Sequence, residues 1–354
     1  MQNLASHTYL EITQQPYAWR GVVNEVDTWA EALVRVWKST NPQEVIFIGC
    51  GSTYYLARSA SAVFRGVVKS AAQAIPASDL LLFPEIAISK GVSQLLVAIS
   101  RSGETTETLR AIEQFRALVS NPVLGVTCYA DSVLAQKVDL AVVAREAHEK
   151  SIAQTRSFSS MLLATQLMAL ILAGERVNSS IRELPEMGVE LMQAYDGLAR
   201  RLAENLSLQR FFFLGSGQFY GLACEVMLKM KEMSLSNSEA FHFLEFRHGP
   251  MSMVDRSTLM VGLLSEKAFT HEVKVLKEMR DLGAKVLAIT PRRLGPDLVD
   301  EQVVLPGGLN DNERGPLYLP VLQLLAYYRS VQKGLDPDKP THLSAVVNLD
   351  LDPV

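Results

Sequence analysis

The chain has 354 residues, of which 48% are hydrophobic and 20% are charged, and its formal net charge is −4. At about 150 residues per domain, this length predicts two domains of ordinary size. The balanced composition excludes a disordered or low-complexity chain. Because the sequence has no block of basic residues, we do not expect it to bind nucleic acid.

The cysteines and the N-terminal residues indicate a cytoplasmic protein. Cys50, Cys128 and Cys224 are widely spaced and odd in number, which fits neither a disulfide framework nor a cysteine-based zinc site. The N-terminus lacks a basic start followed by an apolar core, and the most apolar stretch, residues 161–174, is too short to span a bilayer. We therefore expect a reducing compartment, with no export and no membrane insertion.

The sequence repeats itself at a spacing of about 165 residues, which is the size of a domain. The first copy comprises residues 44–57, 95–115 and 123–143, and the second comprises residues 211–225, 259–279 and 285–305. In each copy, an apolar run of strand length is followed by a small-residue turn and then by a helical pattern, and this arrangement occurs three times. It predicts βαβ units in a buried parallel sheet. The expected fold class is α/β, with two doubly wound, flavodoxin-like parallel-sheet domains in tandem.

The repeat divides the chain into five predicted parts. These are a helical lead-in (1–34), a first α/β domain (35–176), linking helices (177–207), a second α/β domain (208–334) and a proline-rich tail (335–354). In such sheets ligands bind at the carboxyl ends of the strands, so the turns between strand and helix are the places to look for function.

Two of these turns are rich in glycine but do not predict a nucleotide site. Residues 48–55 lack the third glycine of the dinucleotide fingerprint, with Tyr54 in its place, and residues 215–220 fail in the same way. Neither turn has the Lys-Ser/Thr ending of a P-loop. We therefore expect no nicotinamide or nucleotide cofactor, and no cofactor of another kind is indicated.

A third turn, residues 99–109, predicts a phosphate site. Ser100, Ser102 and Thr105 place hydroxyls around Gly103, and Arg101 adds a guanidinium. The N–H groups and dipole of a helix start favour an anion, and arginine can bind one in a bidentate manner. One serine alone would be an ordinary N-cap. The corresponding segment of the second copy, residues 265–272, has an acidic residue and no glycine, so we expect one phosphate site per chain.

Residues 225–234 are predicted to form a helix with a charged stripe. Glu225, Lys229 and Glu232 lie at i, i+4 and i+7 and share one face. An exposed ion-pair stripe is the usual reason for this spacing. Here methionines and leucine surround the stripe, so we expect it to face a cavity, where a carboxyl group can transfer protons.

The next segment, residues 241–254, contains His242, Glu245 and His248 close together. A metal site is not expected, because Gly249-Pro250 ends any helix there and no second histidine has the spacing of the HExxH motif. His248 is instead a candidate for proton transfer.

Together, these motifs resemble the SIS (sugar isomerase) family. They are the tandem repeat, CGST (50–53), SRSGETTET (100–108), EVMLKMKE (225–232) and FRHGP (246–250). The likeness is closest to the double-SIS isomerase half of glutamine:fructose-6-phosphate amidotransferase, or glucosamine-6-phosphate synthase, and to its stand-alone relatives.

The resemblance implies roles for particular residues. The sugar phosphate would be held by Ser52, Thr53, Ser100, Arg101, Ser102 and Thr105. Glu232 would move a proton between C1 and C2, His248 would assist ring opening, and Glu225 with Lys229 would position the open-chain sugar. Residues 149–158 match the family's substrate-lining loop, which makes Ala153, Gln154 and Thr155 neighbours of the sugar. The histidine loop would reach the partner subunit's site, which implies a homodimer.

Two departures from the synthase narrow the expected activity. No glutaminase domain with a leading nucleophilic cysteine precedes the repeat, so we do not expect this chain to release ammonia from glutamine. Ala345 stands where the tail of the synthase has a Schiff-base lysine, so covalent ring opening through that lysine is not expected.

The remaining residues predict aldose–ketose chemistry on a sugar phosphate. The leading hypothesis is isomerisation of a hexosamine 6-phosphate with loss of ammonia, as in glucosamine-6-phosphate deaminases. The alternatives are a plain hexose-phosphate isomerase, a synthase-like isomerase domain without glutaminase, and a sensor that binds sugar phosphate without catalysis. A sensor would need the hydroxyl-rich turn but neither Glu232 nor His248.

Overall fold

The computed structural model describes residues 6–346 and residue 349, and these residues fall into two compact units. The β1–β5 unit contains residues 17–149 and 156–182 together with the described tail residues from 344 onward. The β6–β10 unit contains residues 6–16, 150–155 and 183–343. The short segment 150–155 therefore belongs to a different unit from the residues on either side of it.

The β1–β5 unit is built on one five-stranded sheet. Its strands are Glu44–Gly49 (β1), Ala71–Pro76 (β2), Gln94–Ile99 (β3), Val123–Thr127 (β4) and Leu140–Val143 (β5). They lie in the order β2-β1-β3-β4-β5, and every neighbouring pair is parallel. The central strands are almost continuous apolar runs, as expected for strands that are covered on both faces.

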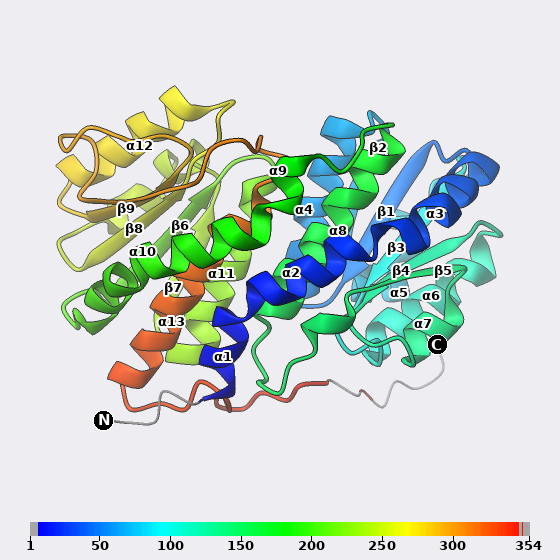
Figure 1. Cartoon of the computed structure of the whole chain (residues 1–354), viewed down its shortest axis with the longest axis horizontal. Helices are drawn as coiled ribbons and strands as arrows, with labels where there is room; N and C mark the ends of the chain where they lie inside the picture. The colour runs from blue at the N-terminus through cyan, green and yellow to red at the C-terminus, as the bar shows by residue number, and fades with distance from the viewer. Residues whose placement is uncertain (1–5, 347–348, 350–354) are drawn as a thin grey trace. The chain divides into compact units, whose positions relative to one another are not determined.

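Helices cover both faces of this sheet (Figure 1). The α-helices of the unit are α2 (Gln15–Asn24), α3 (Val26–Thr40), α4 (Ser52–Val67), α5 (Ala77–Leu82), α6 (Thr106–Leu118), α7 (Val133–Lys137), α8 (Arg156–Leu172) and α9 (Ser179–Arg182). Its 3-10 helices are η1 (Pro84–Ile86) and η2 (Arg145–Ala147). Successive side chains of a strand point to opposite faces. Thus Ile46 and Ile48 join a cluster with Phe115 of α6, whereas Phe47 contacts Phe64 of α4.

The β6–β10 unit repeats the same topology. Its strands are Arg210–Gly215 (β6), Asn237–Phe241 (β7), Thr258–Leu263 (β8), Lys285–Thr290 (β9) and Glu301–Val304 (β10). They lie in the order β10-β9-β8-β6-β7 and are all parallel. Read in chain order, both sheets have the flavodoxin-like order 2-1-3-4-5. The predicted tandem of doubly wound parallel sheets is confirmed.

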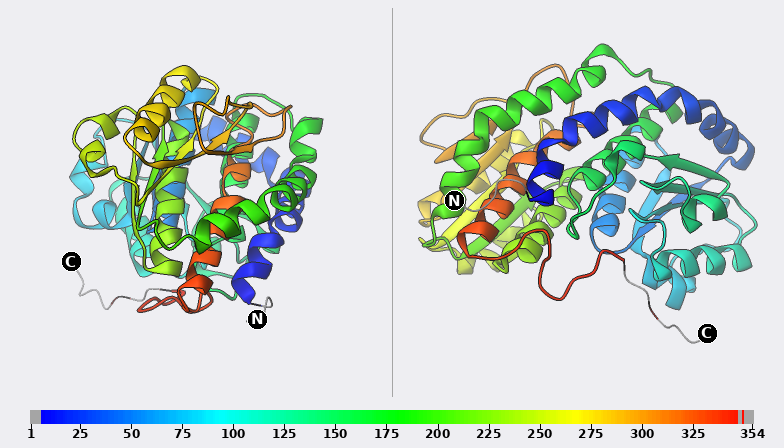
Figure 2. Two further views of the ribbon diagram at one scale, coloured as in Figure 1. Left: turned by 90° about the vertical axis from the view of Figure 1, so that its left-hand side faces the viewer. Right: turned by 60° about the horizontal axis from the view of Figure 1, so that its bottom comes forward.

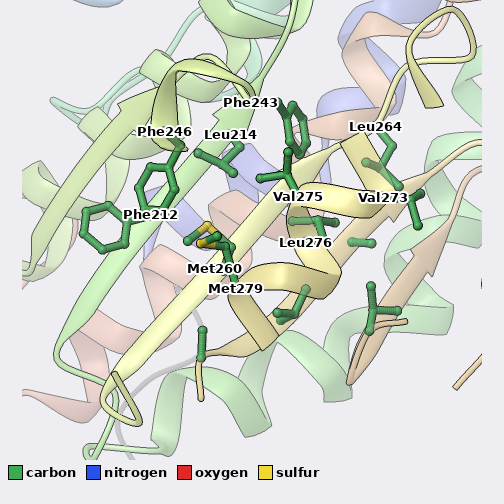
Figure 3. Packing of buried hydrophobic residues seen from close by; sticks show 14 of the residues in the cluster. Phe212, Leu214, Phe243, Phe246, Met260, Leu264, Val273, Val275, Leu276 and Met279 are labelled. Atoms are coloured by element: carbon green, nitrogen blue, oxygen red, sulfur yellow. The ribbon is translucent and has the colours of Figure 1, made fainter. Parts of the chain in front are cut away.

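The core of this second sheet lies on both of its faces. The helices of the unit are α1 (His7–Thr13), α10 (Leu184–Glu204), α11 (Gln218–Ser234), α12 (Phe269–Asp281) and α13 (Pro320–Gln332), with the 3-10 helices η3 (Glu245–Arg247), η4 (Pro250–Met253) and η5 (Gly315–Tyr318). The left-hand view of Figure 2 shows α12 and α13 on opposite sides of the strands. In Figure 3, Phe212, Met260 and Phe246 pack against Leu276 and Met279 of α12.

Within the described residues, no helix combines the length and apolar character needed to cross a lipid bilayer.

Candidate functional site

In the β1–β5 unit, two strand-to-helix turns lie next to each other. Strands β1 and β3 are neighbours in the sheet, so the turn after β1 and the turn after β3 leave the same edge. The two segments are in contact, because Cys50 Sγ lies 3.6 Å from Thr108 Oγ1. The strand order reverses between β1 and β3, and such a switch point is where ligands bind in open parallel sheets.

The turn after β1 presents Ser52 and Thr53 at the start of α4. Both side chains are buried, and Thr53 Oγ1 accepts the N–H of Cys50 at 2.9 Å and donates to the Cys50 carbonyl at 2.9 Å. Burial raises the pKa of the Cys50 thiol to about 11, even though Thr108 acts in the opposite direction. The thiol is therefore protonated at neutral pH, and this turn holds hydroxyls rather than a reactive thiolate.

The turn after β3 is shaped by its own hydroxyls. Ser100 Oγ accepts the N–H of Gly103 and lies 3.1 Å from Thr105 Oγ1, and Ser102 Oγ accepts the N–H of Glu104. Thr105 is the N-cap of α6 but makes no side-chain cap hydrogen bond. Since the first N–H groups of a helix have no partner inside the helix, the start of α6 is suited to an anion.

Gly103 makes the sharp bend of this turn. Its φ of +68° is in the left-handed region, and an added Cβ would lie 2.5 Å from Ser132 Cβ. Only glycine fits here for both reasons. The turn is therefore fixed against the start of α7, where Ser132 is the N-cap and the N–H of Leu134 donates to the Gly103 carbonyl.

The side chain of Arg101 is bonded to other residues of the same unit. Its guanidinium lies 3.5 Å from Glu149 Oε2 and donates to the carbonyl of Ala345 at 2.8 Å. The Glu149 side chain is fully buried and also accepts the N–H and the hydroxyl of Ser157. The arginine charge is therefore balanced by a buried carboxylate and fixed in direction, beside the hydroxyls of Ser100 and Ser102.

A pocket of about 290 Å³ opens beside Arg101, near the lower end of the size range for small-molecule sites. Its lining residues are Arg101, Ser102, Glu104, Tyr129, Asp131, Ser132 and Glu149, together with Ala345 and Val346 of the tail. Ala345, which stands where the resemblance places a lysine, is one of these residues, and its carbonyl accepts the hydrogen bond of Arg101.

The equivalent turn after β8, in the β6–β10 unit, is occupied by carboxylates of the chain itself. Glu272 Oε2 accepts the N–H of Ser265 at 2.6 Å and its hydroxyl at 3.0 Å, and Asp311 accepts the N–H of Glu266. Burial raises the pKa of Glu272. These acceptors stand where an external anion would bind.

Helix α11 carries the charged stripe of the β6–β10 unit. Lys229 Nζ lies 3.3 Å from Glu225 Oε1 and 2.5 Å from Glu232 Oε2. The side chains of Glu225 and Lys229 are 0% and 1% exposed, whereas that of Glu232 is 17% exposed. Of the three groups, only the Glu232 carboxyl reaches solvent.

The ammonium of Lys229 is held in its charged form by its neighbours. Burial lowers the pKa of Lys229, but the carboxylates of Glu225 and Glu232 raise it by more, so it lies above its ordinary value. We call Glu225, Lys229 and Glu232 the triad. Within it, Lys229 keeps a positive charge next to the Glu232 carboxylate.

The loop around His248 follows β7. His248 is exposed, and its backbone N–H donates to the carbonyl of Glu245. Arg247 makes a bidentate ion pair with Glu278, at 2.7 Å and 2.8 Å. His242 stacks on Tyr220. Among the described residues, no group of three or more His, Cys, Asp or Glu side chains is arranged to hold a metal ion.

Segment 150–155 contributes the remaining predicted residues. Ala153 and Thr155 are buried, Gln154 is half-buried, and the carbonyl of Thr155 accepts a hydrogen bond from Gln323 at 3.4 Å. The structure assigns this segment to the unit that also contains Glu232 and His248.

A family model of the SIS domain matches residues 40–171 and 207–296, which cover the β1–β5 sheet, strands β6 to β9 of the second sheet and more than half of the chain. This chain belongs to the SIS domain family. The resemblance inferred from the sequence motifs is thereby confirmed, and the two matched segments correspond to the two copies of the repeat.

Several proteins are similar to this SIS chain over most of its length. A solved structure of glucosamine-6-phosphate deaminase from Thermotoga maritima is 31% identical, with a TM-score of 0.78, and the match covers 97% of this chain and all of that one. Tagatose-6-phosphate ketose/aldose isomerase from Escherichia coli is 24% identical, with a TM-score of 0.86, over 94% of this chain and 95% of that chain, and it supports the fold.

A curated relative is longer than this SIS chain. Glutamine–fructose-6-phosphate aminotransferase (isomerizing) from Methanothermobacter thermautotrophicus is 27% identical over 348 residues, or 96% of this chain. The chain spans 57% of that protein's length.

Two residues of the SIS turns were missed in the sequence. Glu149 balances Arg101, and Glu272 fills the second switch point. An isolated glutamate in a polar stretch carries no signal of its own, so neither contact was detectable from spacing. Glu272 had one usable clue, since it is an acidic residue in the first turn of a helix that follows a strand.

Replacement of Gly103 tests the shape of the first SIS turn. Gly103→Ala adds a collision with Ser132 to the cost of a left-handed backbone, about 1–2 kcal/mol. We expect a lower melting temperature and loss of inorganic phosphate binding in isothermal titration. Gly91→Ala is the matched control, because Gly91 has φ +75° but open space around it. Equal behaviour of the two variants would contradict this account.

Replacement of Lys229 tests the buried triad. Lys229→Met leaves the buried carboxylate of Glu225 without its cation and is expected to lower the free energy of unfolding by about 3–5 kcal/mol. Because the folded pKa of Lys229 is raised, its contribution is complete below pH 10.5 and is lost as the pH rises through the folded value. Lys231→Met, at an exposed position of the same helix, should change stability by less than about 0.5 kcal/mol in the same urea titrations. Similar losses in both variants would refute the role of the triad.

Proposed function

We propose that this chain is a phosphosugar enzyme of the isomerase type that converts a hexosamine 6-phosphate to the ketose phosphate and ammonia. The full-length similarity to a glucosamine-6-phosphate deaminase supports this reaction. The aminotransferase relatives, which are named as isomerizing, support the isomerase step. We place the enzyme in the cytoplasm, where its three cysteines stay reduced.

The phosphate of the substrate is bound at the switch point of the β1–β5 unit. The residues assigned to it are Ser52, Thr53, Ser100, Ser102, Thr105 and Arg101. Hydroxyls supply the neutral donors, since the N–H groups of Thr53 and Ser100 already donate to backbone carbonyls. The uncapped start of α6 supports this assignment, because a helix N-terminus favours an anion and hydroxyls supply further donors. Arg101 approaches the phosphate already oriented by Glu149.

Glu232 is the proton-transfer group, and the observation that carries this assignment is its place in the triad. It is the one carboxyl of the stripe that reaches solvent, and Lys229 holds it in direction. In the open-chain aldose, Glu232 removes the hydrogen of C2 while the aldehyde oxygen at C1 takes up a proton from water, which gives an enolamine, and Glu232 then returns its proton to C1. This gives the imine at C2, and water then hydrolyses the imine to the ketone and ammonia. A positioned base of this kind contributes about 10²–10⁴-fold to the rate.

The other residues act on the same sugar. Lys229 and Glu225 fix the base and the open-chain substrate, and Ala153, Gln154 and Thr155 line the sugar. His248 assists ring opening, which in this chain has no lysine at position 345 to proceed through a Schiff base.

Ammonia release decides between this reaction and plain isomerisation. We expect glucosamine 6-phosphate to yield fructose 6-phosphate and ammonia in equal amounts, measured by coupled enzymatic assays of both products. Glu232→Gln should lower kcat by about 10²–10⁴-fold while sugar phosphate affinity stays near that of the wild type. Glu239→Gln, an exposed glutamate of β7, is the control.

Three results would reject this reading. Ketose phosphate without ammonia would identify a plain isomerase. Binding without any turnover would identify a sensor. Full activity of Glu232→Gln would remove the assigned base.

We propose that the enzyme is a homodimer in which His248 completes the site of the partner. His248 is exposed in the single chain, and Leu244 and Met253 nearby are 49% and 51% exposed. Large apolar side chains beside a polar group are a feature of interfaces.

Mixed dimers test this arrangement. We expect Glu232→Gln and His248→Asn chains to be nearly inactive alone. When dissociated and reassociated together at equal concentration, they should recover about a quarter of wild-type activity, since half the dimers then have one intact site. No recovery from dimers that sedimentation shows to be mixed would mean that His248 acts within its own chain.

A further inference from the structure

The segment 150–155 is held in place by a helix that is far from it in the sequence. Glu11 in α1 is 3% exposed, and its carboxylate faces the first residues of the segment. Glu11 Oε1 accepts the N–H of Lys150 at 2.5 Å. Glu11 Oε2 accepts the N–H of Ser151 at 3.3 Å and is also bonded by the Ser151 hydroxyl. A buried carboxylate that accepts backbone N–H groups fixes their positions, because leaving these groups unpaired is costly.

Helix α1 is itself anchored in the same unit. Asp338 accepts the N–H groups of His7 and Thr8 at 2.9 Å and 2.8 Å, and the Thr8 hydroxyl at 2.7 Å. The ring of Tyr9 lies 5.4 Å from that of Tyr327 in α13. Glu11 is therefore attached to a fixed support and not to a free end.

The far end of the segment has its own anchors. The N–H of Ile152 donates to the carbonyl of Asp338 at 3.4 Å, and Gln323 donates to the carbonyl of Thr155. Between these points, the amide oxygen of Gln154 is buried and has no hydrogen-bond partner among the described residues. The backbone is thus fixed on both sides of Gln154, whose amide oxygen can accept a hydrogen bond from a bound molecule.

We propose that Glu11 is a positioning residue for the reaction. By fixing Lys150 and Ser151, it sets the conformation in which Ala153, Gln154 and Thr155 contact the sugar chain of the substrate. This inference rests on the proposed function, in which those three residues line the sugar. It gives the N-terminal helix a role in substrate recognition, although Glu11 itself does not touch the substrate.

Replacement of Glu11 by glutamine tests this role. The amide keeps one acceptor oxygen but presents an NH₂ group to a backbone N–H, so one of the two main-chain bonds is lost. We expect Glu11→Gln to raise the KM for glucosamine 6-phosphate and to lower kcat, each by about tenfold, because small displacements of substrate-contacting groups have large effects on rate. Glu11→Asp, which keeps both oxygens, should recover part of the loss. Glu31→Gln, at a side chain that is 90% exposed, is the control.

A binding measurement separates positioning from loss of stability. Sorbitol 6-phosphate has the sugar chain but no carbonyl group, whereas inorganic phosphate reports only the phosphate cradle. Well below the melting temperature, Glu11→Gln should weaken binding of sorbitol 6-phosphate about tenfold and leave inorganic phosphate binding unchanged. A purely structural role would leave both affinities unchanged once the folded fraction is accounted for.

Hydrogen exchange completes the test without requiring turnover. In Glu11→Gln, the amides of Lys150 and Ser151 should exchange faster while those of α11 stay protected. If the wild type releases no ammonia, the proposed function fails, and sorbitol 6-phosphate affinity still decides the role of Glu11. Unchanged exchange at Lys150 and Ser151, or wild-type affinity for sorbitol 6-phosphate despite faster exchange, would overturn the inference.

Discussion

The turn N–H groups at the carboxyl edge of each parallel sheet need acceptors, and the two units meet this need in different ways. In the β6–β10 unit, the carboxylates of Glu272 and Asp311 accept the N–H groups of Ser265 and Glu266. In the β1–β5 unit, hydroxyls shape the turn after β3, and the side chain of the N-cap residue of α6 makes no capping hydrogen bond. One switch point is satisfied by the chain itself, and this contrast supports our proposal that the other receives the phosphate of a substrate.

The buried triad of α11 shows a second constraint. Two carboxylates and one ammonium lie on a helix whose other side chains are mostly apolar. The side chains of Glu225, Lys229 and Glu232 are 0%, 1% and 17% exposed, respectively. Replacing such an ion pair by apolar residues is often neutral or stabilising, so stability alone is a weak reason for its presence. A chemical role explains why the most exposed member is a carboxyl group and why the cation beside it is held in its charged form.

Much of this architecture was readable in the sequence, but several connections were not. Strands buried on both faces are continuous apolar runs, so the repeat predicted both sheets, and the spacing of Glu225, Lys229 and Glu232 predicted their shared face. Contacts between distant positions leave no such periodic signal. Arg101 and Glu149 are 48 residues apart, and Glu11 and Lys150 are 139 residues apart. Only the fold brings these pairs together.

The number of sugar phosphates bound per chain tests the central claim most directly. Isothermal titration of the wild-type protein with sorbitol 6-phosphate measures it without turnover. The account predicts a stoichiometry of one per chain, because Glu272 and Asp311 close the second switch point. Two bound molecules per chain, or none, would contradict it.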